Sequence, residues 1–308
     1  MPRILFVKTS SLGDVVHQCP AVSDAARRLP GAEIDWVVEE GFAGIARMHR
    51  AVHRVVPVAL RRWRGAPWKR SVWRELAQFR ASVAAERYDA IVDTQGLLKS
   101  ALITRAARGR RHGMDRASAR EGLAARFYDV RHAVPRGLHA VERNRRLTAA
   151  ALGYALEGNA DYGLKSASQA PTAGAYAVLL TMTSRADKLW PENRWIELGR
   201  ALALPVVLPW GSVAERERAE RIGRAIGQAV VPKAMALDEL ASLFAYARGV
   251  VGLDSGLTHL AAALGVPTVG IYCASDPVLT GLYGSERARN VGAPGRPPEV
   301  FEVMKCLQ

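Results

Sequence analysis

Short apolar runs, rich in valine and isoleucine, recur along the chain and end at turn residues. Runs of this length and composition predict buried parallel β-strands. In the first half they cover Arg3–Val7, Ile34–Val38, Val55–Val58 and Ala90–Asp93. In the second half they cover Ala177–Thr181, Val206–Pro209, Gly249–Leu253 and Thr268–Tyr272. Between the runs, apolar residues recur at helical spacing, as in "VVHQCPAVSDAARRL", "WRELAQFRASVAAERY", "PENRWIELGRALA" and "LDELASLFAYA".

Strands that alternate with helices predict βαβ units and an α/β fold with doubly wound parallel sheets. The alternation occurs twice, and the polar stretch "EGNADYGLKSASQAPTAGA" separates the two occurrences. We therefore expect two Rossmann-like domains, residues 1–165 and 166–308, with a linker near residues 160–174. Open α/β sheets bind ligands at the carboxyl ends of their strands. If the two sets of strand ends face each other, the ligand site is a cleft between the domains.

The charge of the chain is distributed unevenly. Residues 1–168 carry a net charge of +13 out of the total of +14, whereas residues 169–308 carry +1. An arginine-rich surface without a functional role would spread the excess over both halves. A basic half instead favours an anionic partner: nucleic acid, a membrane surface, or a phosphorylated or carboxylated substrate. No apolar run approaches the roughly 18 residues of a membrane span, and the N-terminus lacks the features of a signal peptide.

The stretch "KTSSLGDVVH" follows the first predicted strand and leads into a helix. A carboxylate at such a helix start, here Asp14, often only caps the helix or interacts with its dipole. The hydroxyls of Ser10 and Ser11 can already cap this helix, so Asp14 is available as a general base for a substrate hydroxyl. His17 lies one turn further on, where a lone histidine is more often structural.

Two turns in the second half have anion-binding features. The stretch "MTSRADKLW", just before a helix start at Pro191, offers hydroxyls and a lysine suited to a diphosphate. In "DSGLTHLAAALG", Asp254 ends a strand, Gly256 allows close backbone approach and His259 falls in the first turn of a helix. The N–H groups of that helix can bind an anion, although a capped helix with a buried histidine is the alternative. After "LPWG", Glu215 stands at the start of a charged helix. It could contact a ligand, or it could belong to a solvent-exposed face of that helix.

These stretches together resemble the lipopolysaccharide heptosyltransferases, inverting GT-B enzymes of glycosyltransferase family 9. The resemblance covers nearly the whole chain through "KTSSLGDVVH", "DWVVEEGF", "RRWR", "DTQGLLKS", "HGMDRASAREGLAARFYDV", "LPWG" and "DSGLTHLAAALG". The segments "VVEEGFAGI" and "VPVALRRWR" favour the heptosyltransferase I branch over heptosyltransferase II. The resemblance implies an acceptor-binding first domain facing a donor-binding second domain across a cleft. It further implies transfer of L-glycero-D-manno-heptose from ADP-heptose to a Kdo (3-deoxy-octulosonate) residue of Kdo2-lipid A, in lipopolysaccharide inner-core biosynthesis.

The resemblance also implies roles for individual residues. Asp14 would be the catalytic base, and Lys188 would stabilise the departing ADP together with the helix N-terminus at Gly256. The donor-binding residues would be Thr183, Ser184, Lys188, Glu215, Met235, Asp254, Ser255, Gly256 and His259. The acceptor-binding residues would be Arg61, Arg62, Arg64, Lys99 and Arg120.

Neither a cofactor nor a metal ion is expected, since ADP-heptose is a substrate. The sequence has no D-x-D pair placed for a metal-bound nucleotide and no His/Cys cluster. The implied acceptor carries carboxylates and phosphates in an anionic leaflet, which would account for the basic first half. The resemblance implies a cytoplasmic enzyme, peripheral on the cytoplasmic face of the inner membrane. Within "LRRWRGAPWKRSVWRE", three tryptophans stand among arginines and could contact lipid or belong to the core.

Three other functions fit part of the pattern. A nucleic-acid-binding protein would suit the basic half, but no zinc-finger, RNP or helix-turn-helix signature is present, so no nucleic-acid partner is expected. A dinucleotide oxidoreductase would carry G-x-G-x-x-G in its first βα turn, and this chain does not. Heptosyltransferase II, or another GT-B sugar-nucleotide enzyme such as an epimerase, would share the architecture.

Overall fold

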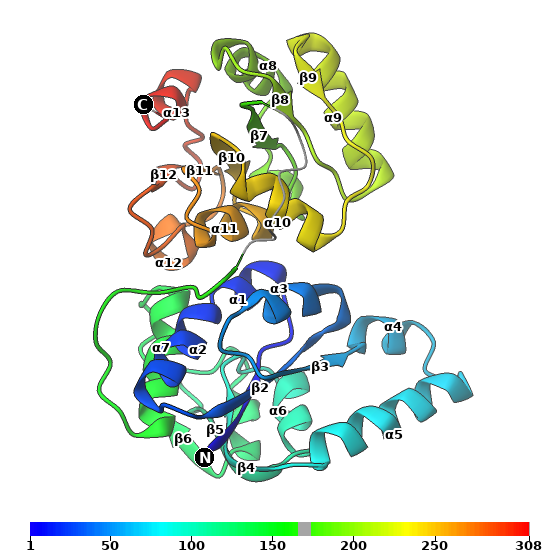
Figure 1. Ribbon diagram of the computed structural model, residues 1–308, viewed down its shortest axis with the longest axis vertical. Coiled ribbons are helices and arrows are strands. Elements are labelled where there is room, and N and C mark those ends of the chain that lie inside the picture. Colours follow the sequence, from blue (N-terminus) through cyan, green and yellow to red (C-terminus); the bar gives the residue numbers. More distant parts are fainter. Residues whose placement is uncertain (166–173, 308) are drawn as a thin grey trace. The chain divides into compact units, whose positions relative to one another are not determined.

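The computed structural model of the chain describes residues 1–165 and 174–307. These residues form two compact units, Met1–Leu164 and Lys165–Gln308, and each unit is built on one six-stranded sheet (Figure 1). The expected domain boundary after residue 165 is one residue beyond this division. Residues 166–173 of the expected linker lie outside the described residues.

The first unit contains a six-stranded parallel sheet in the order β3-β2-β1-β4-β5-β6. Its strands are β1 (Arg3–Val7), β2 (Glu33–Glu39), β3 (Arg54–Val58), β4 (Arg87–Asp93), β5 (Arg108–Met114) and β6 (Val130–His132). Its α-helices are α1 (Leu12–Val16), α2 (Cys19–Arg28), α3 (Ala43–Met48), α4 (Leu60–Gly65), α5 (Arg70–Ala84), α6 (Leu98–Thr104) and α7 (Ala140–Leu152). Two short 3₁₀ helices, η1 (Glu40–Phe42) and η2 (Gly122–Phe127), complete it.

The second unit repeats this topology, with the order β12-β11-β10-β7-β8-β9 and all neighbours parallel. Its strands are β7 (Ala177–Leu180), β8 (Val206–Val207), β9 (Ala229–Val230), β10 (Gly249–Leu253), β11 (Thr268–Tyr272) and β12 (Ala288–Gly292). Its helices are η3 (Ala186–Lys188), α8 (Glu192–Ala201), α9 (Val213–Ile226), α10 (Leu237–Ala245), α11 (Gly256–Ala263), α12 (Pro277–Thr280) and α13 (Val300–Lys305).

Both sheets have the Rossmann strand order, which reverses direction next to the first strand of each unit. The reversal lies between β1 and β4 in the first unit and between β7 and β10 in the second. The central strands are fully buried, as their unbroken apolar runs predict, and helices cover both faces of each sheet (Figure 1). Loops that leave the carboxyl ends of these central strands are therefore the expected ligand-binding segments.

Several expected elements differ in detail. The helix expected over "VVHQCPAVSDAARRL" is two helices, α1 and α2, because Pro20 in the first turn of α2 cannot continue a preceding helix. The helix expected to reach Tyr88 ends at Ala84, and β4 begins at Arg87. Strands β5, β6, β9 and β12 were not expected. The sequences "RGRRHGM" and "ARNVG" of β5 and β12 contain no apolar run, and β6 and β9 are only three and two residues long.

Candidate active site

The loops after β1 and β4 are tied together by one amide side chain. Gln95 Oε1 accepts hydrogen bonds from the backbone N–H groups of Thr9 (2.9 Å) and Ser10 (3.1 Å). Asp93, the buried last residue of β4, in turn accepts from the Gln95 N–H at 2.8 Å and from the Tyr128 hydroxyl at 2.7 Å. The turn that carries Asp14 is thus anchored to the neighbouring strand at the point where the strand order reverses.

Asp14 lies in the first turn of α1, and its carboxylate has two kinds of partner. Its Oδ2 accepts from the backbone N–H of Ser11 at 3.0 Å, so it does take part in a capping box. The Arg120 guanidinium, from the loop after β5, holds both carboxylate oxygens at 2.7 and 3.3 Å. The Asp14 side chain is 13% exposed, so a solute can reach it.

The Asp14 carboxylate is held in its ionised form. Burial alone would raise its pKa, but the charges of Lys8 and Arg120 and the hydrogen bond from Ser11 outweigh this and lower the pKa to about 2. An anion that paired with Arg120 in place of Asp14 would raise the basicity of Asp14, because this guanidinium is one of the two main cations that lower the Asp14 pKa.

Lys8 is a residue of this site to which the sequence alone gave no role. It is the residue after β1, it is only 3% exposed, and its ammonium donates to Thr94 O at 2.9 Å and Asn144 Oδ1 at 3.3 Å. Burial lowers its pKa to about 8, although the Asp14 charge pulls the pKa the other way. A lysine directly at the carboxyl end of the first strand was the signal that could have identified it.

The expected acceptor residues fall into two groups. Arg120 contacts Asp14, and Lys99, from α6, donates to the Ser10 hydroxyl at 2.9 Å in the turn before Asp14. Arg61, Arg62 and Arg64 lie apart from these contacts, on α4. The side chains of Arg61 and Arg62 contact residues of η1 and α5. The structure therefore brings Lys99 and Arg120 to the turn of Asp14, and it gives Arg61 and Arg62 other contacts.

On α4, the arginines differ in how strongly they are held. Arg62 donates to Glu40 at 3.0 Å and to Glu75 at 3.1 Å, so its charge is already balanced. The Arg61 guanidinium lies over the Phe42 ring, 5.1 Å from its centroid. Arg64 is exposed.

The three tryptophans beside these arginines separate into two classes. Trp63 is 8% exposed, packs edge-on against Phe79 and donates to Glu75 at 2.8 Å, so it belongs to the core. Trp68 and Trp73 are 76% and 63% exposed. Two large apolar rings are therefore presented to solvent among basic residues.

In the second unit, Asp254, which directly follows β10, contacts three of the other expected donor residues. Lys188 Nζ donates to Asp254 Oδ2 at 2.6 Å, and His259 Nε2 lies 3.4 Å from Asp254 Oδ1. The Thr183 hydroxyl donates to the Asp254 backbone carbonyl at 3.0 Å. Ser275, from the loop after β11, also donates to the carboxylate and had not been expected. Burial would raise the pKa of Asp254, but the bonds from His259, Lys188 and Ser275 lower it well below its usual range.

At the start of α11, the Thr258 side chain packs closely against the backbone of β10. Ser255 is its N-cap, and the Ser255 hydroxyl lies 3.1 Å from that of Thr258, which donates to Leu253 O at 2.6 Å. A Cβ on Gly252 would lie 2.3 Å from this Thr258 oxygen. Glycine in β10 therefore lets the first turn of α11, which begins at Gly256, sit directly on the strand end.

The remaining expected donor residues are less constrained. Ser184 is exposed in the turn after β7. Glu215 lies in the first turn of α9, where its Oε2 accepts from the Gly211 N–H at 2.7 Å. This bond gives Glu215 a capping role of its own. Met235 lies half-buried in the segment before α10.

The described part of the chain holds neither a cluster of metal-ligating side chains nor a membrane-spanning helix. It contains no group of three or more His, Cys, Asp or Glu side chains arranged to hold a metal ion. Among the described helices, none combines the length and the hydropathy needed to cross a bilayer.

Comparison with known proteins gives consistent matches. A family model described as glycosyltransferase family 9 (heptosyltransferase) matches residues 76–305. Lipopolysaccharide heptosyltransferase 1 of Escherichia coli strain K12 is 47% identical over 293 residues, which cover 92% of each chain. The solved structure of the E. coli heptosyltransferase WaaC with ADP has a TM-score of 0.91 and 42% identity over 98% of each chain. Its structure with ADP-2-deoxy-2-fluoro heptose has a TM-score of 0.88 over the same shares and the same identity.

Proposed function

Because the chain belongs to glycosyltransferase family 9, the heptosyltransferases, we propose that it transfers L-glycero-D-manno-heptose from ADP-heptose to a Kdo residue of Kdo2-lipid A. The similarity to a solved relative that holds ADP, and to the same relative with a fluorinated ADP-heptose, supports the donor. The name of the E. coli relative, a lipopolysaccharide heptosyltransferase, supports the acceptor. The transfer proceeds with inversion and uses no metal ion and no cofactor.

In the proposed mechanism, Asp14 removes the proton from the attacking Kdo hydroxyl. The observation that carries this assignment is the ionised carboxylate in the first turn of α1, which is paired with Arg120 and lies in the field of the Lys8 ammonium. A carboxylate with a pKa of about 2 is a weak base. When a Kdo carboxylate takes over the Arg120 guanidinium, Asp14 loses that cation and becomes the stronger base that the reaction needs. Lys99, which reaches the same turn, would hold the acceptor with Arg120.

The leaving ADP is stabilised by the second unit. Negative charge builds on the β-phosphate as the oxocarbenium-like transition state forms. The Lys188 ammonium, the hydroxyls of Thr183 and Ser184, and the N-terminus of α11 at Ser255 and Gly256 are the donors suited to that charge. The Asp254 carboxylate positions the Lys188 ammonium at 2.6 Å, and His259 contacts the other oxygen of the same carboxylate. Glu215 and Met235 would hold the ribose and adenine ends of ADP.

The surface of α4 and α5 supports a membrane-bound acceptor. Trp68 and Trp73 are exposed beside Arg61 and Arg64, and tryptophan with arginine is the composition that favours a lipid headgroup layer. Each basic residue near an anionic leaflet contributes about 1 kcal/mol. We propose that this surface holds the enzyme, as a peripheral protein, on the cytoplasmic face of the inner membrane while Arg61, Arg62 and Arg64 contact the acceptor.

One assay tests the function and the base together. The protein is incubated with ADP-heptose and Kdo2-lipid A, and both ADP release and a mass increase of one heptose are measured. Asp14→Asn should lower transfer by roughly 10²–10⁴-fold and leave ADP binding intact. Asp129→Asn is the matched control, since Arg111 holds that carboxylate in the same two-pronged way on the same unit. Near-normal turnover by Asp14→Asn would remove Asp14 as the base, and no heptosyl product from the unaltered chain would remove the function.

A further inference from the structure

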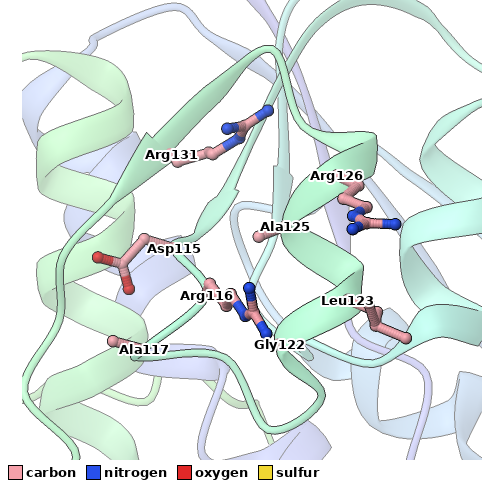
Figure 2. A pocket seen from close by; sticks show the side chains of 8 residues that line it. All are labelled: Asp115, Arg116, Ala117, Gly122, Leu123, Ala125, Arg126 and Arg131. Carbon is pink, nitrogen blue, oxygen red and sulfur yellow. The ribbon is translucent and has the colours of Figure 1, made fainter.

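A cavity of about 460 Å³ opens in the first unit, outside the residues discussed so far (Figure 2). Three segments line it: the loop after β5, the helix η2 and the strand β6. Its principal side chains are Asp115, Arg116, Leu123, Ala125, Arg126 and Arg131. The family resemblance assigns none of them to donor or acceptor.

The charge of this cavity is not balanced by the protein. Arg116, Arg126 and Arg131 are exposed, and in the described part of the chain none of the three has an ion-pair partner. The acidic residue of the lining, Asp115, is already engaged: its carboxylate accepts from the Ser118 N–H at 2.8 Å, and the bonds from the Ser118 hydroxyl and N–H lower its pKa. Gathered like charges in a concave site raise the local affinity for an anion.

One of these arginines, Arg116, lies close to the start of η2. A Cβ on Gly122, the first residue of η2, would lie 2.9 Å from the Arg116 carbonyl oxygen and 3.0 Å from Arg116 Cγ. Glycine therefore allows Arg116 to lie against η2, which itself carries Arg126. Figure 2 shows the three arginines on three separate segments around the cavity, with their guanidinium groups apart from one another and the Asp115 carboxylate turned to the side away from Arg116.

We propose that this cavity binds a phosphate monoester carried on a sugar-sized group. Guanidinium groups pair with phosphate through parallel hydrogen bonds. A site with three of them suits a phosphate dianion better than it suits a carboxylate, which carries one negative charge. The cavity is larger than a phosphate alone and lies in the size range of small-ligand sites. Leu123, 51% exposed, and Ala125 supply an apolar side for the organic part. The loop after β5, which carries Asp115 and Arg116, also carries Arg120. The cavity and the Arg120–Asp14 ion pair therefore share one segment of the chain.

Two sources carry this chemistry: a soluble sugar phosphate, or the phosphorylated sugar headgroup of a lipid. The lipid-borne source rests on the proposed function, whereas the soluble source does not. The test compares two triple variants of equal charge. The cavity variant combines Arg116→Gln, Arg126→Gln and Arg131→Gln, and the control combines Arg80→Gln, Arg87→Gln and Arg108→Gln. The control arginines are exposed on the same unit and lie outside the cavity lining.

The soluble arm measures glucose 1-phosphate by calorimetry, with glucose as the uncharged comparison. The lipid arm measures flotation with vesicles that contain lipid A, against phosphatidylglycerol vesicles of equal surface charge. In at least one arm, the unaltered chain and the control should bind the phosphate monoester, and the cavity variant should bind it at least about tenfold more weakly. Raised salt should weaken the binding. The arm that responds identifies the source.

Equal behaviour of the cavity variant and its control in both arms would overturn the proposal. Far-UV circular dichroism and ADP binding check the fold of each variant. If the cavity variant does not fold, the single change Arg131→Gln, on the exposed position of β6, carries the same comparison against Arg108→Gln. Heptose transfer is measured separately: a chain that binds the phosphate but transfers no heptose contradicts the proposed function and leaves this site standing.

Discussion

Replacing Lys8 by methionine tests the electrostatics at the end of β1. Lys8 is 3% exposed, so its charge is shielded from water, and burial lowers its pKa from 10.5 to about 8. A difference of roughly 2.5 pKa units corresponds to about 3 kcal/mol by which folding disfavours the charged form. Methionine keeps most of the volume and removes this cost. It also leaves Thr94 O and Asn144 Oδ1 without their donor, at a cost that does not depend on pH.

The sign of the pH dependence follows from the lowered pKa. Below about pH 8, Lys8 is charged in both the folded and the unfolded state, and the folded chain carries the full cost. Between about pH 8 and 10.5, the folded chain has released a proton that the unfolded chain still holds, so the stability of the unaltered chain rises with pH. Relative to Lys8→Met, it should therefore gain about 3 kcal/mol of unfolding free energy across this window.

Urea unfolding followed by far-UV circular dichroism at pH 7, 8, 9 and 10 measures this difference. Lys69→Met is the control, because the Lys69 side chain is exposed and should change stability equally at every pH. If the stability curves of the unaltered chain and Lys8→Met ran parallel from pH 7 to 10, the argument that Lys8 is buried as a charge would be wrong. In the transfer assay, Lys8→Met should raise the pKa of the Asp14 carboxyl, since Asp14 loses the cation that lowers this pKa most, and the rise of transfer rate with pH should move to higher pH.

Two further changes test the second unit. Lys188→Met should weaken ADP-heptose binding and lower the rate constant for transfer by about 10²–10³-fold, because a donor aimed at the leaving phosphate is lost; steady-state kinetics measures both, and Lys305→Met, exposed on α13, should match the unaltered chain. Gly252→Ala should cost about 1–3 kcal/mol and weaken ADP binding, since the new Cβ would lie 2.3 Å from the Thr258 hydroxyl. Gly249→Ala, in the same strand with its nearest contact at 3.6 Å, should do neither in thermal unfolding or calorimetry.

Much of the architecture could be predicted from the pattern of apolar residues. Eight buried strands and the repeated α/β organisation were expected, and the GT-B class is confirmed by the match to the E. coli enzyme. Central strands such as β1 and β10 are buried on both faces, apart from Arg3 at the start of β1, and their buried residues are accordingly apolar or glycine. Strands β5 and β12 lie toward the sheet margins, where arginines and an asparagine can remain exposed, and their sequences lose the strand signature.

Only those parts of the site that lie within a single sequence motif could be predicted. Asp14, Asp254 and their local partners stand at strand ends, where the sequence shows them directly. The bond between Arg120 and Asp14 joins residues 106 positions apart, and no local pattern reveals it. Lys8 was overlooked for a related reason: its role depends on burial, which arises only when the loops after β1 and β4 have packed over it.

Each sheet draws all its strands from one continuous stretch of the chain, and this has a consequence for synthesis of the protein. Residues up to Leu164 contain every strand of the first sheet, so this sheet can form without a later segment. The amino-terminal half can therefore acquire its native form on the ribosome while the remainder is still being translated. The arginine-rich half then does not remain unfolded while the second half is being synthesised.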